Sequence, residues 1–215
     1  MTVWSWKRRL GGPELSFVDS SIYTDPEIFE LELEKIWRRT WLLAVHESEL
    51  PNRYDYRTLT VAREPVAIIR GDDDKVRAFL NVCPHRGAQL LRAPAGNLAD
   101  ASPSGSTKHI TCMFHAWQFD AQGQCKAIPR RRAGYQDRLE CADASLHEIS
   151  CEIGLGGFVW VYLEGDAPPL KDYIGRAFDD LRPHLEAEPL EVFHHHKAVV
   201  STNYKLWHDT NSEFY

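Results

Sequence analysis

The sequence is organised around two short segments, CPHRG at residues 83–87 and CMFHAW at residues 112–117. Each segment offers one thiol and one imidazole, spaced Cys-x-His in the first and Cys-x-x-His in the second. Two Cys and two His side chains together form a set that can hold a metal. We therefore predict a metal centre whose four ligands are Cys83, His85, Cys112 and His115.

The mixture of Cys and His within each segment indicates which kind of metal centre this is. Zinc also binds Cys2His2 sets, but zinc fingers usually pair Cys with Cys and His with His in separate loops. In a Rieske-type [2Fe-2S] cluster, one iron takes both thiolates and the other takes both imidazoles. Neutral imidazoles make such a cluster easier to reduce, at about −150 to +300 mV against about −400 mV for all-Cys plant ferredoxins. We predict the iron-sulfur cluster and keep zinc as the alternative.

Composition excludes several classes of partner. The formal net charge of −6 gives no reason to expect nucleic acid or an anionic membrane as a partner. No apolar run approaches the length of about 18 residues that a membrane span needs, and we expect no export signal. Of the five cysteines, Cys125, Cys141 and Cys151 remain outside the predicted centre, too few and too irregular for a disulfide framework. We therefore expect a cytoplasmic protein.

Hydrophobic patterning predicts an α+β fold, mainly antiparallel β. Asp25 is placed to cap a helix that ends in Arg38 and Arg39, with Pro26 at its first position. The segments predicted to be strands before and after the two Cys/His segments are 41–45, 56–62, 66–70, 76–81, 146–153 and 157–163. The last of these is a nearly continuous apolar run, so we expect it to be well buried.

We predict three regions in the chain. Residues 1–40 form an N-terminal arm and a helix that packs on a catalytic domain. Residues 41–165 form the cluster domain, and residues 166–215 begin the catalytic domain. Within that last region we expect a helix over 173–185 broken by Pro183, a strand over 191–200, and a helix from Asn203 through Phe214.

These motifs resemble the N-terminal part of the large subunits of the Rieske non-haem iron oxygenases. The resemblance covers essentially the whole chain, and it has two departures. The segment between His85 and Cys112 is 26 residues long, which is longer than usual in ring-hydroxylating members. Met113 and Ala116 stand where the family usually has Pro and Gly. Neither departure removes a predicted ligand. The long segment, together with residues 193–196 and 203–211, is similar to the branch of the family that oxidises small alkanesulfonates.

The resemblance implies an oxidoreductase that uses NADH and O2, as a monooxygenase or a dioxygenase. It implies a ferredoxin and a reductase as electron donors, a small beta subunit and a trimer-based oligomer. It also implies a mononuclear non-haem Fe(II), held in the family by two His and one carboxylate. This chain lacks those ligands, so we expect a truncated or split product. By resemblance, Glu213 is the bridge for electrons between subunits, where the family usually has Asp.

Two other functions stay open on the sequence alone. A self-contained Rieske ferredoxin would carry electrons and catalyse nothing. An aromatic-acid ring-hydroxylating oxygenase subunit would share the cluster domain and differ in its substrate.

Overall fold

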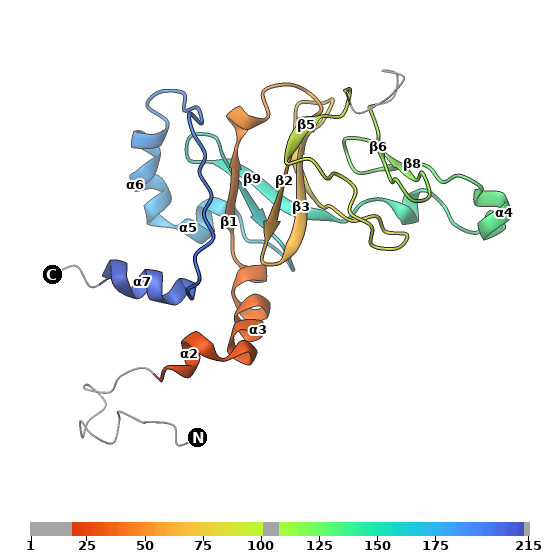
Figure 1. Cartoon of the computed structure of the whole chain (residues 1–215). Coiled ribbons are helices and arrows are strands. Elements are labelled where there is room, and N and C mark those ends of the chain that lie inside the picture. The colour runs from red at the N-terminus through yellow and green to blue at the C-terminus, as the bar shows by residue number, and fades with distance from the viewer. Residues whose placement is uncertain (1–18, 101–107, 213–215) are drawn as a thin grey trace. The chain divides into compact units, whose positions relative to one another are not determined.

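The computed structural model describes residues 19–100 and 108–212, and the chain divides into two compact units. The larger unit comprises Arg38–His194 and contains all the strands of the described residues (Figure 1). The smaller unit combines the described parts of Met1–Trp37 and His195–Tyr215, and these are helical where they are regular.

The larger unit is built on a seven-stranded antiparallel sheet with the order β1-β10-β9-β4-β3-β2-β5. Its strands are β1 (Leu42–His46), β2 (Asp55–Val61), β3 (Glu64–Arg70), β4 (Val76–Leu80), β5 (Ala95–Asn97), β9 (Glu148–Gly154) and β10 (Phe158–Tyr162). The predicted antiparallel α+β fold is confirmed. The edge strand β5 was not predicted, because Ala95-Gly96-Asn97 has none of the β-branched or aromatic residues that mark strands.

A second, three-stranded antiparallel sheet has the order β6-β7-β8. Its strands are β6 (Ile110–Thr111), β7 (Gln118–Phe119) and β8 (Cys125–Ala127). The two sheets share one hydrophobic core, in which Phe79 of β4 and Phe119 of β7 are almost completely buried. Cys83 and Cys112 belong to the same core, so the predicted metal centre lies where the two sheets meet.

Strand β3 separates this core from a second one. Ala67 and Ile69 join the core shared with the small sheet, whereas Val66 and Ile68 pack into the other core. Successive side chains of a strand point to opposite faces, so β3 is buried on both sides. In β10 the expected burial is reached at alternate positions: Val159 and Val161 are fully buried, whereas Phe158, Trp160 and Tyr162 are half-buried.

The chain after β10 differs from the prediction in two places. Helices α5 (Leu170–Ile174) and α6 (Arg176–Leu185) are separated at Gly175, and Pro183 lies inside α6 without ending it. Gly175 has φ of +64°, a conformation that other residues rarely adopt. The predicted strand over 191–200 is absent from the described structure, because its backbone has no neighbouring strand to pair with.

The smaller unit contains three helices and is described here by itself. They are α2 (Ser21–Thr24), α3 (Pro26–Lys35) and α7 (Tyr204–Ser212). As predicted, Asp25 caps α3, with its carboxylate accepting from the Glu27 N–H at 2.8 Å. The Asn203 side chain likewise accepts from the N–H of Lys205 at 3.0 Å at the start of α7. Among the described residues, no helix has the length and apolar character required to cross a membrane.

An ion pair joins α3 to α7, and an aromatic contact joins Trp37, which follows α3, to α7. The Lys205 ammonium donates to the Glu32 carboxylate at 2.7 Å, and both side chains are largely buried. The rings of Trp37 and Tyr204 meet edge to face with centroids 4.9 Å apart. Segments from the two ends of the described chain therefore fold together.

In the larger unit, the side chain of Asn81 holds the loop after β4 in place through two hydrogen bonds to Leu91. Its side chain is buried, donates to the carbonyl of Leu91 at 2.7 Å and accepts from the Leu91 N–H at 2.9 Å. This pair of hydrogen bonds closes the loop that contains the CPHRG segment onto the end of the sheet.

Replacing Asn81 by alanine should therefore destabilise the larger unit. The change leaves the buried Leu91 N–H unpaired, whereas the Leu91 carbonyl keeps the Gln89 amide as a donor at 3.2 Å, so the expected cost is about 1 to 3 kcal/mol. The free energy of unfolding in urea measures this loss. Asn52→Ala, at an exposed turn position, is the matched control and should change that free energy by less than about 0.5 kcal/mol. Equal effects of the two substitutions would contradict the role of Asn81.

Candidate metal centre

The first Cys/His loop lies between β4 and β5 and folds back on its cysteine. The carbonyl of Cys83 accepts from the Gly87 N–H at 2.8 Å, and the Cys83 N–H donates to the Ala88 carbonyl at 2.7 Å. Gly87 has φ of +70°, so this turn uses a left-handed backbone that suits glycine. The turn holds the Cys83 thiol and the His85 ring on the same side of the loop.

The second Cys/His loop, between β6 and β7, repeats this pattern. The carbonyl of Cys112 accepts from the Ala116 N–H at 2.9 Å, and the Cys112 N–H donates to the Trp117 carbonyl at 2.8 Å. Ala116 occupies the position equivalent to Gly87 and has φ of +55°. Since this position holds alanine and not glycine, Ala116 must adopt a left-handed backbone. This lowers the stability of the fold by about 1 kcal/mol or more.

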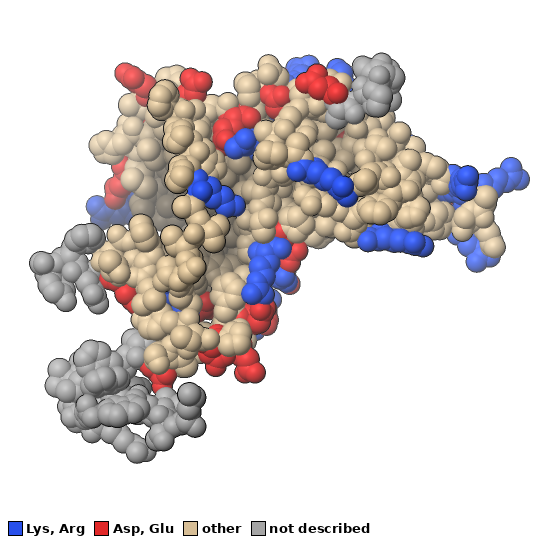
Figure 2. All heavy atoms as spheres, in the orientation of Figure 1, with Lys and Arg blue, Asp and Glu red and all other residues tan. Residues whose placement is uncertain are grey.

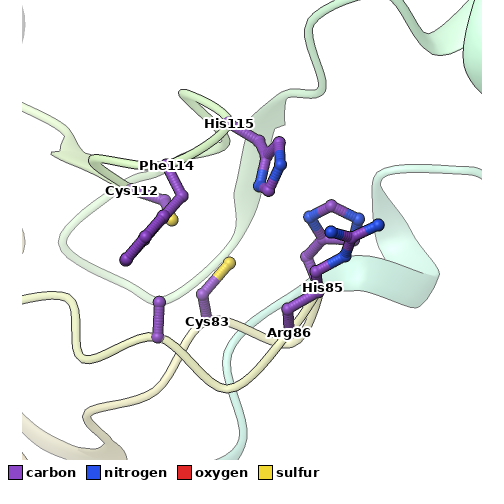
Figure 3. Close-up of a pocket in the computed structure, with 7 residues that line it drawn as sticks. Cys83, His85, Arg86, Cys112, Phe114 and His115 are labelled. Carbon is purple, nitrogen blue, oxygen red and sulfur yellow. The ribbon is translucent and has the colours of Figure 1, made fainter.

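The two loops face one another across a pocket of about 300 Å³. Figure 3 shows the sulfur atoms of Cys83 and Cys112 on one side and the two imidazoles on the other. The residues that line the pocket are Cys83, His85, Arg86, Ala88, Cys112, Phe114 and His115. The structure thus brings all four predicted ligands to one pocket, with the thiols and the imidazoles segregated.

The ring of His85 is held on several sides. It stacks on the indole of Trp117, with centroids 4.8 Å apart and planes within 9° of parallel. The His115 ring meets it edge to face at 4.6 Å. The Tyr135 hydroxyl forms a hydrogen bond of 2.9 Å with Nε2 of His85. Sequence analysis missed Tyr135, and nothing in the spacing of the surrounding residues marks it.

Local electrostatics favour a neutral imidazole at this position. Burial lowers the pKa of His85, and the nearby His115 and Arg86 lower that pKa further. A histidine binds metal through its neutral form. At the neighbouring thiol, burial raises the pKa of Cys83, while backbone N–H groups of His85 and Arg86 act in the opposite direction. Those N–H groups point at the sulfur and favour its anionic form.

The donor atoms fit an iron-sulfur cluster. Nδ1 of His85 is buried and has no hydrogen-bond partner among the described residues, while Nε2 is already occupied by Tyr135. Both Cys83 and Cys112 are buried free thiols. In the described part of the chain, no three His, Cys, Asp or Glu side chains converge closely enough for a single metal ion. A [2Fe-2S] cluster, in contrast, requires only two protein ligands at each iron.

Three further cysteines lie outside the pocket, and all five cysteines of the chain are free thiols. Burial, together with contact with the thiol of Cys141, raises the pKa of Cys125 to about 12. Burial likewise raises the pKa of Cys151 to about 12. Thiols with such pKa values stay protonated at neutral pH, so they are poor metal ligands.

Glu213, predicted from resemblance to bridge electrons between subunits, lies outside the described residues. Its predicted role therefore stays a prediction. The helix that leads toward it, α7, is described as far as Ser212.

An antiparallel β domain with two loops that each present one Cys and one His at a shared pocket defines the class of Rieske-type cluster domains. The sequence profile of the family described as the Rieske [2Fe-2S] domain matches residues 40–147. This match shows that the chain belongs to the Rieske [2Fe-2S] domain family, as the sequence indicated, and the relatives described below are components of oxygenases.

Two curated relatives match nearly the whole chain. The chain is 57% identical over 199 residues to the methanesulfonate monooxygenase hydroxylase subunit alpha of Methylosulfonomonas methylovora, covering 93% of this chain and 48% of that protein. It is 38% identical to the 2-aminobenzenesulfonate 2,3-dioxygenase subunit alpha of an Alcaligenes species, again covering 93% and 48%. The chain thus spans about half the length of these relatives.

Solved structures agree on the fold. The naphthalene 1,2-dioxygenase of a Rhodococcus species superposes with a TM-score of 0.66 at 30% identity, covering 79% of this chain and 36% of that one. A quaternary ammonium Rieske monooxygenase superposes with a TM-score of 0.65 at 32% identity, covering 75% and 43%.

Substitutions at the equivalent positions Ala116 and Gly87 should change the free energy of unfolding in opposite directions. Ala116→Gly should stabilise the protein by about 1 kcal/mol, because it removes the cost of a left-handed alanine. Gly87→Ala should destabilise it by about the same amount, and only through φ, since no atom lies within 4 Å of the added Cβ. Urea unfolding of both variants measures the difference. Shifts in the same direction would contradict the shared geometry.

The raised pKa of Cys151 predicts how its alkylation depends on pH. The thiolate fraction of Cys151, with a pKa of about 12, should rise about tenfold per pH unit between pH 8 and 11. An unperturbed thiol, with a pKa of about 8.5, levels off above about pH 9. Iodoacetamide labelling followed by mass spectrometry of the Cys151 peptide measures the rate, and circular dichroism checks that the fold persists. A plateau near pH 9 would disprove the effect of burial.

Proposed function

We propose that this chain is the electron-transfer part of a multicomponent Rieske oxygenase. In this proposal Cys83 and Cys112 hold one iron of a [2Fe-2S] cluster, and His85 and His115 hold the other. The observation that carries it is the pocket of about 300 Å³ in which the two thiols and the two imidazoles are segregated. Such a cluster supplies one-electron transfer at a potential above that of all-Cys clusters.

The chain's own residues prepare the pocket for that task. Trp117 supports the His85 ring from one face, and the core shared by the two sheets keeps water from the cysteines. His115 and Phe114 are exposed at the rim of the pocket. Because electron transfer needs close approach to the ligands, the rim with His115 is where we propose that electrons enter or leave.

For the whole protein we propose oxygenation of a small sulfonate, with methanesulfonate as the first substrate to test. Two relatives support this: the names of both the 57% and the 38% identical proteins contain a sulfonate. We further propose a ferredoxin and an NADH-dependent reductase as donors, a small beta subunit, and a trimer-based assembly.

We propose a mononuclear Fe(II) in a catalytic domain that begins with residues 166–215. Glu213 would connect that iron to the cluster of an adjacent subunit. Five free cysteines also support a reducing compartment such as the cytoplasm.

Cluster content tests the assignment of the ligands. Protein purified without oxygen should contain iron and acid-labile sulfide, and its reduced form should give a rhombic electron paramagnetic resonance (EPR) signal. Cys83→Ser and Cys112→Ser should each lose most of the iron, because a weak ligand replaces a thiolate. Cys151→Ser, outside the pocket, is the matched control and should retain it. Zinc in place of iron, with no EPR signal, would overturn the proposal.

The identity of the histidine ligands requires a second substitution. His85→Cys adds an anionic thiolate, so a cluster that assembles should move from the Rieske range toward the value of about −400 mV of all-Cys clusters. A redox titration followed by EPR measures the midpoint potential. An unchanged potential in a variant with a full cluster would mean that His85 is not a ligand.

A further inference from the structure

We infer that Tyr135 is a positioning residue for the metal centre, which fixes the orientation and tautomer of His85 and thereby tunes the reduction potential of the bound cluster. This inference rests on the proposed cluster and on His85 as one of its ligands. It assigns a role to a residue that lies outside both Cys/His loops.

The geometry around His85 leaves its two ring nitrogens with different tasks. Nε2 lies 2.9 Å from the Tyr135 hydroxyl oxygen. Nδ1 is buried and has no hydrogen-bond partner among the described residues. Stacking on Trp117 fixes the plane of the ring, but stacking alone permits a flip that exchanges the two nitrogens. The hydrogen bond to Tyr135 selects one of the two flipped arrangements.

Tyr135 is the last residue of a short helix, and ion pairs hold this helix to the chain that follows it. Helix α4 (Arg131–Tyr135) begins after Arg130 and ends before Gln136, both with left-handed φ. The guanidinium of Arg131 pairs with Asp137 at 3.4 Å and with Glu140 at 3.1 Å, which ties the helix to the chain that follows it.

The two sides of this segment differ. Figure 2 shows Lys and Arg side chains at the end of the molecule where α4 lies, so its outer side faces solvent. Tyr135, by contrast, is half-buried and packs against the core that contains Cys83 and Cys112. Its ring meets that of Trp117 edge to face at 6.1 Å. An otherwise exposed segment therefore places one aromatic side chain against the pocket.

The chemistry of this hydrogen bond sets the direction of its effect. When Nδ1 of His85 is a ligand, Nε2 carries the ring proton and donates it to the oxygen of Tyr135. A metal-binding histidine that donates its other N–H becomes a more basic ligand. A more basic ligand favours the oxidised iron, so the hydrogen bond lowers the reduction potential. His115 is exposed, and none of the described residues forms a hydrogen bond with its ring.

Tyr135→Phe tests the inference, because it removes only the hydroxyl. In protein purified with its cluster, we expect iron and sulfide content near that of the parent and a higher midpoint potential at pH 7. We expect the reduction equilibrium to shift by several-fold up to about tenfold, and tenfold corresponds to about 59 mV for one electron. Pulsed EPR should also show altered coupling of one of the two histidine nitrogens.

The matched control is Tyr173→Phe, which removes a hydroxyl that bonds to Thr40 away from the pocket. It should leave the potential and the nitrogen couplings unchanged. A Tyr135→Phe protein with a full cluster, the parental potential and the parental couplings would overturn the inference. If Tyr135→Phe instead loses the cluster, Tyr135→Gln decides: its amide oxygen can accept from Nε2, so recovery of the cluster supports the inference. Equal loss in both variants overturns it, because a restored hydrogen-bond acceptor at position 135 would then fail to restore the metal centre.

The outcomes also separate this inference from the proposed function. A parent protein that binds no iron would reject the cluster itself. A parent with a cluster that is unaffected by Tyr135→Phe rejects only the role of Tyr135.

Discussion

The structure depends on one backbone arrangement that occurs twice. In each Cys/His loop, the carbonyl of the cysteine accepts from the N–H four residues later, and the cysteine N–H donates to the carbonyl five residues later. This pair of bonds turns the loop tightly enough to bring a thiol and an imidazole to one side. The fourth residue must then adopt a left-handed backbone, which Gly87 does freely and Ala116 does at a cost.

The sequence could predict that the four Cys and His side chains lie in two loops of one site, because that information is local. A cysteine and a histidine two or three residues apart share a loop whatever the rest of the chain does. Six strands of the large sheet were also predictable, since each contains β-branched or aromatic residues bounded by turn residues. Tyr135 was not predictable, because its contact with His85 joins residues 50 positions apart and depends on how the two sheets pack.

The errors after β10 have specific physical causes. Pro183 was expected to end a helix, yet a proline near the C-terminal end of α6 removes only one backbone hydrogen bond. Gly175 breaks the helix instead, through a backbone conformation that the sequence did not reveal. The segment 191–200 has the composition of a strand, but a strand exists only when another strand supplies hydrogen bonds. Similarly, β5 forms because β2 offers an unpaired edge, in spite of its own weak propensity.

The strands of the small sheet are only two or three residues long, so few backbone hydrogen bonds hold it together. One Cys/His loop follows β4 of the large sheet, and the other lies within the small sheet between β6 and β7. Any group bound by all four side chains is consequently a cross-link between the two sheets. Metal binding and folding are coupled in such an arrangement. A bound cluster would therefore add most to the stability of the small sheet, which few backbone hydrogen bonds of its own hold together.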